Sequence, residues 1–201
     1  MKKTVLYKSH ENAGAKFAPF AGYEMPINYG SGALEEHRLT RRSVALFDIS
    51  HMGQLLVSGP GAGEALSPLV SSRILDMGPG AARYALLLSE QGGILDDLFI
   101  YKLPKQTDSW FIVANASNKQ NDIQRLRELL PPTVNVQDLS IENCMIAVQG
   151  PRAVELIDRI SDGALSKTER FSMTEAQAAG IPAKIGRTGY TGEDGAEIYY
   201  S

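Results

Sequence analysis

Short apolar runs separated by glycine-rich or polar breaks recur along this chain, a pattern that predicts β-strands joined by hairpins. The clearest hairpin pairs residues 82–89 with residues 94–103 across the turn Glu90-Gln91-Gly92-Gly93. Hairpins join antiparallel neighbours, so the pattern argues against a parallel sheet with helical crossovers. The same reasoning predicts further strands over residues 47–57, 110–114, 183–187 and 195–200.

Helical spacing of apolar residues is found in fewer places. It predicts a short helix over residues 32–42, a helix from the Gly59-Pro60-Gly61 break to about residue 70, and an amphipathic helix over residues 118–130. Residues 174–180 fit either a helix or a loop. Residues 1–30 are expected to be irregular, with aromatic side chains among glycines and prolines.

An internal repeat indicates two related units. Residues 55–66 match residues 146–157: each copy reads as a strand, a Gly-Pro turn and a helix with proline near its first turn, where a missing N–H costs nothing. The predicted fold class is therefore α+β, with two ferredoxin-like (split α+β) units built on mainly antiparallel sheets. The first unit, with the N-terminal aromatic loops, is expected over residues 1–139, and the second, incomplete unit over residues 140–201.

Composition places the chain among soluble globular proteins, since 43% of its 201 residues are hydrophobic and 21% are charged. Its net charge of −3 is spread without basic clusters, which argues against nucleic acid as a partner. No run reaches the ~20 apolar residues that span a bilayer, and the N-terminus lacks a signal peptide, so no membrane association and a cytoplasmic location are predicted.

The cysteine and histidine residues argue against a disulfide and against a metal site. The single cysteine, Cys144, excludes an internal disulfide and lies in an apolar run, as a buried small hydrophobic residue does. The histidines His10, His37 and His51 are far apart in the sequence, without the spacing of metal ligands on a helix. No metal site is therefore predicted.

Two aspartates, Asp96 and Asp97, stand side by side inside the apolar run of residues 94–101. Adjacent strand residues point to opposite faces, so Asp97 shares a face with Phe99 and Tyr101 while Asp96 faces the other way. If both faces are covered, at least one carboxylate is poorly solvated, which is tolerated where a carboxylate serves a ligand. One exposed aspartate beside one that is hydrogen-bonded to backbone would also explain the pair.

Residues 187–197 form a second unusual segment, rich in glycine, threonine and acidic residues around Tyr190. Glycines permit a close approach of backbone to a ligand, and tyrosine offers a flat face with a polar tip. Glu197, where the next strand begins, could accept two hydrogen bonds from a flat polar ring. For the glycines alone, a hairpin with charged turn residues is the simpler explanation.

Over essentially its whole length, the chain resembles the T-protein of the glycine cleavage system, an aminomethyltransferase. Three long motifs carry the resemblance: Phe47-Asp48-Ile49-Ser50-His51-Met52-Gly53, Gly92-Gly93-Ile94-Leu95-Asp96-Asp97-Leu98 and Arg187-Thr188-Gly189-Tyr190-Thr191-Gly192-Glu193-Asp194-Gly195. Shorter matches in the same order are Glu36-His37, Val113-Ala114-Asn115-Ala116 and the loop over residues 20–26.

The resemblance implies a reaction. T-proteins accept an aminomethyl group carried on the lipoyl arm of H-protein and pass its carbon to tetrahydrofolate, the acceptor substrate. Ammonia is released and 5,10-methylenetetrahydrofolate is left. The catalytic role would fall to the second aspartate of the pair, Asp97, and Asp96 would be structural.

The resemblance also implies a set of folate contacts, among which Glu197 would bind the pterin ring. The matching residues are Met52, Tyr84, Tyr101, Asn115, Tyr190 and Glu197. The predicted hairpin brings some of them together independently, because it places Tyr84 on the strand opposite Asp97 and Tyr101 on the same strand face as Asp97.

The chain departs from the family pattern at its end. Residues 196–201 read as a strand still in progress, which predicts an N-terminal fragment of a longer protein; a strand that closes a sheet is the alternative. The family continues with a folate-contacting arginine and a C-terminal β-barrel domain, which this sequence does not contain. The fragment itself is therefore expected to be inactive and to bind folate weakly or not at all.

Two other functions fit parts of the same pattern. A folate-dependent demethylase would share the fold but take its carbon from a small methylated molecule instead of a lipoyl arm. A non-catalytic folate-binding regulator is the other alternative, and relatives of that kind carry a cysteine in the motif that here reads Thr188-Gly189-Tyr190-Thr191-Gly192-Glu193. The retention of Asp97 and the lack of that cysteine favour the aminomethyltransferase.

Overall fold

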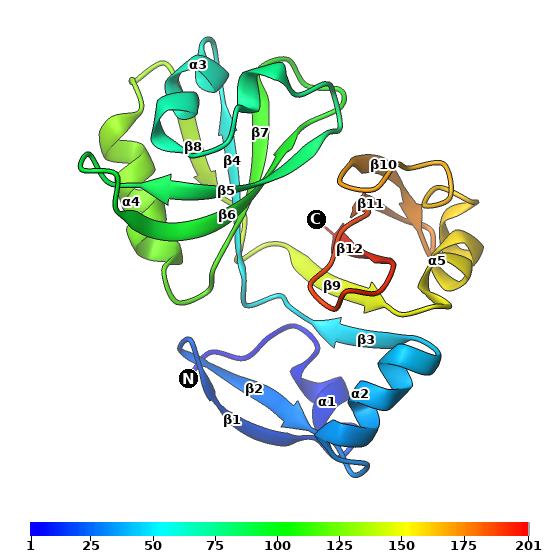
Figure 1. Ribbon diagram of the computed structural model, residues 1–201. Helices are drawn as coiled ribbons and strands as arrows, with labels where there is room; N and C mark the ends of the chain where they lie inside the picture. The colour runs from blue at the N-terminus through cyan, green and yellow to red at the C-terminus, as the bar shows by residue number, and fades with distance from the viewer. Residues whose placement is uncertain (201) are drawn as a thin grey trace. The chain divides into compact units, whose positions relative to one another are not determined.

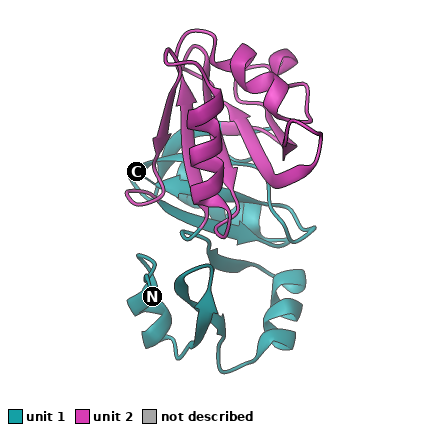
Figure 2. Cartoon of the chain, turned by 90° about the vertical axis from the view of Figure 1, so that its left-hand side faces the viewer, with its two compact units in different colours: residues 1–51, 144–170, 174–201 teal, residues 52–143, 171–173 magenta. Residues whose placement is uncertain are grey.

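The computed structural model describes residues 1–200, whose backbone contacts form two compact units (Figure 2). Unit 1 contains Met1–His51, Cys144–Arg170 and the residues from Thr174 onward, and unit 2 contains Met52–Asn143 and Phe171–Met173. The chain returns to unit 1 close to the boundary expected at residues 139–140. The first 51 residues, however, group with the second half of the chain, because their last strand hydrogen-bonds to the strand that follows this return.

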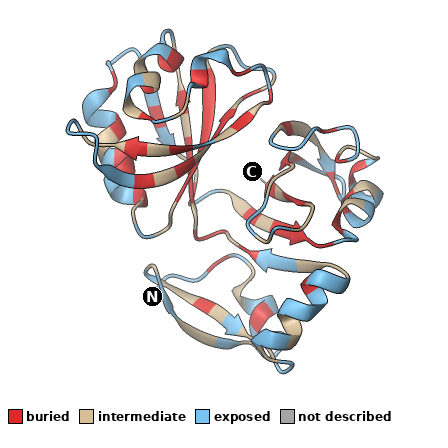
Figure 3. Cartoon of the chain, in the orientation of Figure 1, coloured by how far each residue is buried: buried red, intermediate tan, exposed pale blue. Residues whose placement is uncertain are grey.

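Unit 2 is built on a five-stranded sheet in the order β5-β6-β7-β4-β8. The predicted hairpin forms one side of it, with β5 (Ala82–Leu88) antiparallel to β6 (Ile94–Lys102). The other strands, also paired antiparallel, are β7 (Ser109–Ala114), β4 (Gly53–Ser58) and β8 (Asn135–Asp138). The central strand, β7, is buried along its whole length (Figure 3).

Helices cover one face of this sheet (Figure 1). They are α3 (Ala62–Leu66) and α4 (Lys119–Leu129), with the 3-10 turns Ser67–Leu69 and Ile74–Asp76. Leu66 of α3 and Leu126 of α4 join Leu98 and Ile100 of β6 in one core, and all four are at most 1% exposed. Burial of each such side chain stabilises the fold by roughly 1.5–3 kcal/mol. This core fixes which residues of β6 point towards the helices.

Unit 1 contains a second five-stranded sheet, in the order β10-β11-β12-β9-β3. Its strands are β10 (Met173–Ala178), β11 (Ile181–Gly186), β12 (Gly195–Tyr200), β9 (Cys144–Gln149) and β3 (Ala45–Asp48). Helix α5 (Ala153–Ser161) packs on one face, where Ile157 meets Val148 and Ile198. The N-terminal elements of the unit are α1 (Tyr7–Asn12), the hairpin of β1 (Lys16–Phe20) and β2 (Tyr23–Asn28), and α2 (Ala33–Arg42).

The predicted fold class, α+β with mainly antiparallel sheets, is confirmed. The repeat is visible as well, because β4 and α3 follow the same pattern as β9 and α5, with Gly59 and Gly150 at equivalent turns. Their φ angles are 125° and 132°. A Cβ on Gly59 would lie 2.4 Å from the carbonyl oxygen of Thr133, and one on Gly150 would lie 2.5 Å from that of Ser43. Each turn therefore requires glycine.

Some segments differ from the prediction. The run over residues 47–57 is divided between two sheets, because the Asp48 carboxylate accepts a hydrogen bond from the Ser50 backbone N–H at 3.0 Å and turns the chain. Residues 1–30, expected to be irregular, contain α1 and the β1–β2 hairpin. The strand β10 replaces the predicted helix or loop; it lies at a sheet edge, where polar residues are tolerated. Ser201, at the end of the predicted terminal strand, lies outside the described residues.

Across residues 1–200, none of the helices combines the length and the apolar character that crossing a membrane requires.

Candidate functional site

Asp96 and Asp97 occupy adjacent positions of β6 and face opposite sides of the sheet. Asp96 lies on the side of Leu98 and Ile100, whose side chains form the core under the helices, and it is 6% exposed. Asp97 lies on the other side, with Phe99, and is partly buried. The sequence-based expectation that the two carboxylates point in opposite directions is met by this arrangement.

Asn115, the residue after β7, connects the two carboxylates. Its Nδ2 donates to Oδ1 of Asp96 and to Oδ1 of Asp97, each at 2.9 Å. Asn118 donates a further hydrogen bond to Oδ1 of Asp96 at 3.0 Å. Burial by itself would raise the pKa of Asp96, but hydrogen bonds from Asn115, Asn118 and the Asp122 side chain outweigh it and lower that pKa. Asp96 is therefore a buried anion held by donors, and Asp97 shares one of those donors.

The tyrosines Tyr84 and Tyr101 lie on the Asp97 side of the sheet. Tyr84 pairs with Phe99, whereas the partner of Asp97 itself is Leu86, so Tyr84 is diagonal to the carboxylate. Tyr84 is 50% exposed. Tyr101 is fully buried, and its ring centroid lies 5.2 Å from that of Phe99. The exposed ring of Tyr84 is accessible to a ligand, whereas Tyr101 packs within the sheet face.

Glu197 lies in unit 1, on β12. Its neighbours Ala196 and Ile198 point into the core beneath α5, so Glu197 faces the opposite side of the sheet. Its Oε2 accepts hydrogen bonds from Tyr199 Oη at 2.7 Å and from Thr188 Oγ1 at 3.3 Å. Burial raises the pKa of Glu197 in spite of both bonds. Because a carboxylate has two acceptor oxygens, Glu197 keeps capacity to bind a further donor.

The loop between β11 and β12 is closed at its base by an ion pair. Arg187 donates to both carboxylate oxygens of Asp194, at 3.3 and 2.8 Å, and to the Thr168 carbonyl at 2.9 Å. The hydrogen bonds from Arg187 and its positive charge lower the pKa of Asp194. At the tip of the loop, Tyr190 is 90% exposed. The charged turn residues thus fix the loop, as the hairpin explanation requires, and they present one aromatic ring to solvent.

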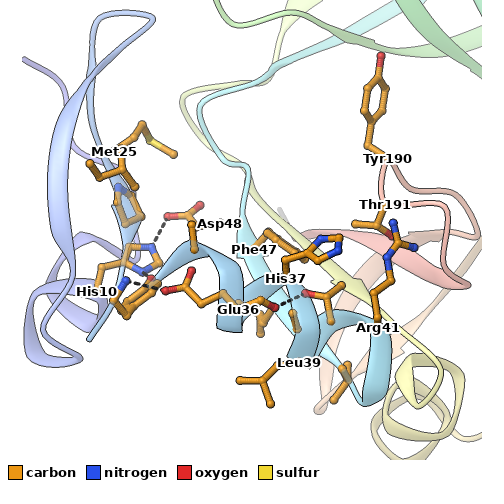
Figure 4. Close-up of a pocket in the computed structure, with 18 residues that line it drawn as sticks. His10, Met25, Glu36, His37, Leu39, Arg41, Phe47, Asp48, Tyr190 and Thr191 are labelled. Carbon is orange, nitrogen blue, oxygen red and sulfur yellow. Dashed lines mark hydrogen bonds and ion pairs between the residues drawn. The ribbon is translucent and has the colours of Figure 1, made fainter. Parts of the chain in front are cut away.

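A pocket of about 660 Å³ lies in unit 1, lined by residues of β2, α2, β3 and the loop tip (Figure 4). In its wall, His10 is hydrogen-bonded to Tyr29 Oη at 2.7 Å and to Asp48 Oδ2 at 3.0 Å. Burial would raise the pKa of Asp48, but hydrogen bonds, including those from Ser50 and His10, lower it. Tyr190 is the member of the predicted site that lines this pocket.

Comparison with known proteins decides the family. The family model described as the GCVT N-terminal domain matches residues 6–201. The chain belongs to this family. The aminomethyltransferase of Prosthecochloris aestuarii is 44% identical in an alignment covering 98% of this chain and 54% of that protein. The resemblance to T-proteins inferred from the motifs is thereby confirmed.

Two solved structures have a fold similar to that of this chain. The glycine cleavage system aminomethyltransferase T from Bartonella henselae has a TM-score of 0.90 and 39% identity, covering 99% of this chain and 53% of that chain. The chain thus spans about half the length of the relatives it matches. The heterotetrameric sarcosine oxidase from Corynebacterium sp. U-96, with a TM-score of 0.56 and 16% identity, has a similar fold over 83% of this chain and 82% of that one.

The structure places the predicted site residues of this GCVT chain in two groups, each within one unit. Asp97, Tyr84, Tyr101 and Asn115 come together on and beside β6 of unit 2. Met52, also of unit 2, lies just before β4 and is partly buried. The other group, in unit 1, consists of Tyr190 and Glu197.

Sequence reasoning missed the residues that hold the site in place. Asn118 and Asp122 lie one helical turn apart at the start of α4 and both contact Asp96. The available signal was Asp122, which takes a buried position at helical spacing from Leu126. In unit 1, Thr188 and Tyr199 were likewise missed as the donors to Glu197. Across the described residues, no cluster of three or more potential metal ligands is found.

Proposed function

We propose that this chain forms the tetrahydrofolate-binding and catalytic part of a cytoplasmic aminomethyltransferase of the glycine cleavage system. The observation that carries the proposal is the Asn115 amide that fixes Asp96 and Asp97, in a chain whose relatives are named aminomethyltransferases. The donor would be the aminomethyl group on the lipoyl arm of H-protein, and the acceptor would be tetrahydrofolate.

The reaction balances without an oxidant or a reductant. The transferred carbon loses its bonds to the lipoyl sulfur and to the amine nitrogen, and it gains bonds to N5 and N10 of the folate. The two protons displaced from those nitrogens go to the thiol and to ammonia. The transferred carbon has iminium character on the way, so positive charge develops beside the folate nitrogens.

Asp97 is assigned the catalytic role because a carboxylate can stabilise that positive charge. Its Oδ1 is held by a neutral amide, which fixes the group without neutralising it. A charge that is already in place need not reorganise as the transition state forms. The same carboxylate can accept a folate N–H and orient the acceptor nitrogen.

Six residues are assigned to folate contact: Met52, Tyr84, Tyr101, Asn115, Tyr190 and Glu197. The exposed rings of Tyr84 and Tyr190 offer flat surfaces, and Glu197 would bind the pterin ring through its remaining acceptor capacity. Contact by Tyr101 requires its fully buried ring to become accessible.

The test compares two forms of the protein: this chain alone, and this chain joined to the remaining part of the P. aestuarii relative. Each is incubated with aminomethyl-loaded H-protein and tetrahydrofolate, and ammonia and methylenetetrahydrofolate are measured. The joined protein is expected to form both products in equal amounts, and the chain alone to form little or none. A joined protein that accepts carbon from an N-methylated amino acid but not from H-protein would instead identify a demethylase. Folate binding with neither activity would identify a non-catalytic regulator.

A further inference from the structure

Asp122 of α4 and Asp96 of β6 form a buried carboxyl pair beneath the helix. Their exposed fractions are 2% and 6%, and each side chain shifts the pKa of the other. Asn118, one helical turn before Asp122, donates to Oδ1 of Asp96 at 3.0 Å, which places Asp122 on the helix face that meets Asp96. A carboxylate can only accept hydrogen bonds, so a bond between two carboxyl groups requires a proton on one of them. The pair therefore carries one proton and one negative charge while this bond exists.

The surroundings decide which residue carries the proton. Asp96 accepts amide hydrogen bonds from Asn115 and Asn118, at 2.9 and 3.0 Å, and these donors favour its charged form. Oδ2 of Asp122 is buried and, among the described residues, receives no hydrogen bond, so a negative charge there would be unsatisfied. Burial, together with the hydrogen bond to Asp96 and its charge, raises the pKa of Asp122 to about 8.

Other charged residues lie near Asp122, but Asp96 is the one that shifts its pKa. On the same helix, Arg125 and Glu128 line a hollow together with Asp122, and Lys119 is buried one turn earlier. From the β5–β6 turn, Glu90 pairs with Arg125 at 3.8 Å. From the sheet, Asp96 is the charged group bonded to Asp122.

We propose that Asp122 is a positioning residue for Asp97, acting through Asp96 and Asn115. The Asp122 proton bonds Asp96 in a fixed orientation, and Asp96 then holds the Asn115 amide. The same Nδ2 atom of Asn115 binds Asp97 at 2.9 Å. The contacts lead from the helix-covered face of the sheet to the opposite face, where Asp97 lies. The location of the proton on Asp122 does not depend on the proposed function, whereas its effect on catalysis rests on that function.

Removal of this proton would place two negative charges in contact. The carboxylates would repel each other, Asn115 would lose its fixed acceptor, and Asp97 would lose its fixed donor. Small displacements of a catalytic group can lower a rate by about 10²-fold. Of the six proposed folate contacts, Asn115 is the one that takes part in this network, so KM for folate should change less than kcat.

The first experiment locates the proton in the chain itself, by carboxyl ¹³C NMR between pH 5 and 10. A buried aspartate resonance is expected to titrate near pH 8, to be absent in Asp122→Asn, and to persist in the control Glu128→Gln on the same helix. The Asn115 side-chain amide resonance should shift with the same midpoint, because its acceptor Asp96 responds when Asp122 loses its proton. An Asp122 signal that titrates below pH 5, or an Asn115 amide that does not respond, would overturn the proposal.

The second experiment measures transfer by the joined protein. Wild-type kcat is expected to fall above about pH 8. Asp122→Asn, whose amide donates to Asp96 at every pH, should remove that fall and keep the rate at pH 7. Asp122→Ala should lower kcat about tenfold or more with little change in KM. An unchanged kcat in Asp122→Ala, with folding verified by circular dichroism, would refute the positioning role. If the wild type transfers nothing, the proposed function fails, and the NMR result still decides whether the proton lies on Asp122.

Discussion

The side-chain amide of Asn115 donates a 2.9 Å hydrogen bond to Asp97, and the same nitrogen donates one of equal length to Asp96. One neutral donor thus holds two adjacent carboxylates that face opposite sides of a strand. Because Asp96 is nearly fully buried, its charge depends on such donors more than that of Asp97 does.

Asn115→Ala is expected to destabilise the protein by about 1–3 kcal/mol, because it leaves a buried carboxylate short of a donor. Denaturant unfolding followed by circular dichroism measures the change. The matched control is Asn121→Ala, at an exposed position of α4, which should leave the midpoint almost unchanged. Equal midpoints for the two variants would show that Asn115 does not stabilise Asp96.

Asp97→Asn is expected to lower the transfer rate of the joined protein by about 10²-fold or more, because the amide cannot balance the positive charge of the transition state. Folate affinity, measured by calorimetry, should change far less. Glu90→Gln, at the exposed turn of the same hairpin, makes the same chemical change away from the site. A variant as fast as wild type would remove Asp97 from the mechanism.

Local patterns predicted those parts of the fold that depend on short segments. The β5–β6 hairpin follows from two apolar runs and a Gly-Gly turn, and the opposite directions of Asp96 and Asp97 follow from strand geometry. The division of the chain into units does not follow from local patterns, because β3 pairs with β9, a strand far away in the sequence. In this pairing Asp48 lies opposite Ile146. No local signal encodes that pairing.

As with the fold, only the part of the candidate site that depends on a short segment could be predicted from the sequence. The pair Asp96 and Asp97 could be singled out because carboxylates interrupt an apolar strand, whereas the choice of Asp97 as the catalytic member came from the resemblance to T-proteins. The role of Asp122 could not, because a lone aspartate in a helix is ordinary until the fold places it against Asp96. Likewise, the resemblance to T-proteins implied a folate contact at Tyr101, and only the structure shows that its ring is buried and packs near Phe99.

The raised pKa of Glu197 predicts a pH-dependent stability. Burial favours the protonated form in the folded state, so the resulting stabilisation is present below the unfolded pKa of about 4.3 and is lost as pH rises through the higher folded pKa. Glu197→Gln cannot ionise. It should therefore gain stability over wild type between pH 4 and pH 7, while binding folate more weakly.

Unfolding free energies of both proteins at pH 4 and pH 7 measure this difference. The control, Glu142→Gln, changes an exposed glutamate of unit 2 and should show no such divergence between the two pH values. If the difference in unfolding free energy between Glu197→Gln and wild type is the same at pH 4 and pH 7, burial does not raise the pKa of Glu197.

The ion pair of Arg187 with Asp194 predicts that the loop carrying Tyr190 depends on a bidentate donor. Arg187→Lys retains the charge but not the two parallel bonds to Asp194, so it should destabilise the protein by about 1–3 kcal/mol. Asp194→Asn should cost a similar amount at pH 7. In wild type, the lowered pKa of Asp194 means that this stabilisation is present above about pH 4 and is lost as pH falls through the folded pKa.

A double-mutant cycle at pH 7 separates the pair from its surroundings, because Arg187 also donates to the Thr168 carbonyl. The two single changes should be less than additive. In the joined protein, both variants should also weaken folate binding, since a loosened loop no longer holds the exposed Tyr190 ring in place. Full additivity would mean that Arg187 acts through other contacts, such as the carbonyls of Thr168 and Leu165, and not through Asp194. If a destabilised variant binds folate as tightly as wild type, Tyr190 is not a folate contact.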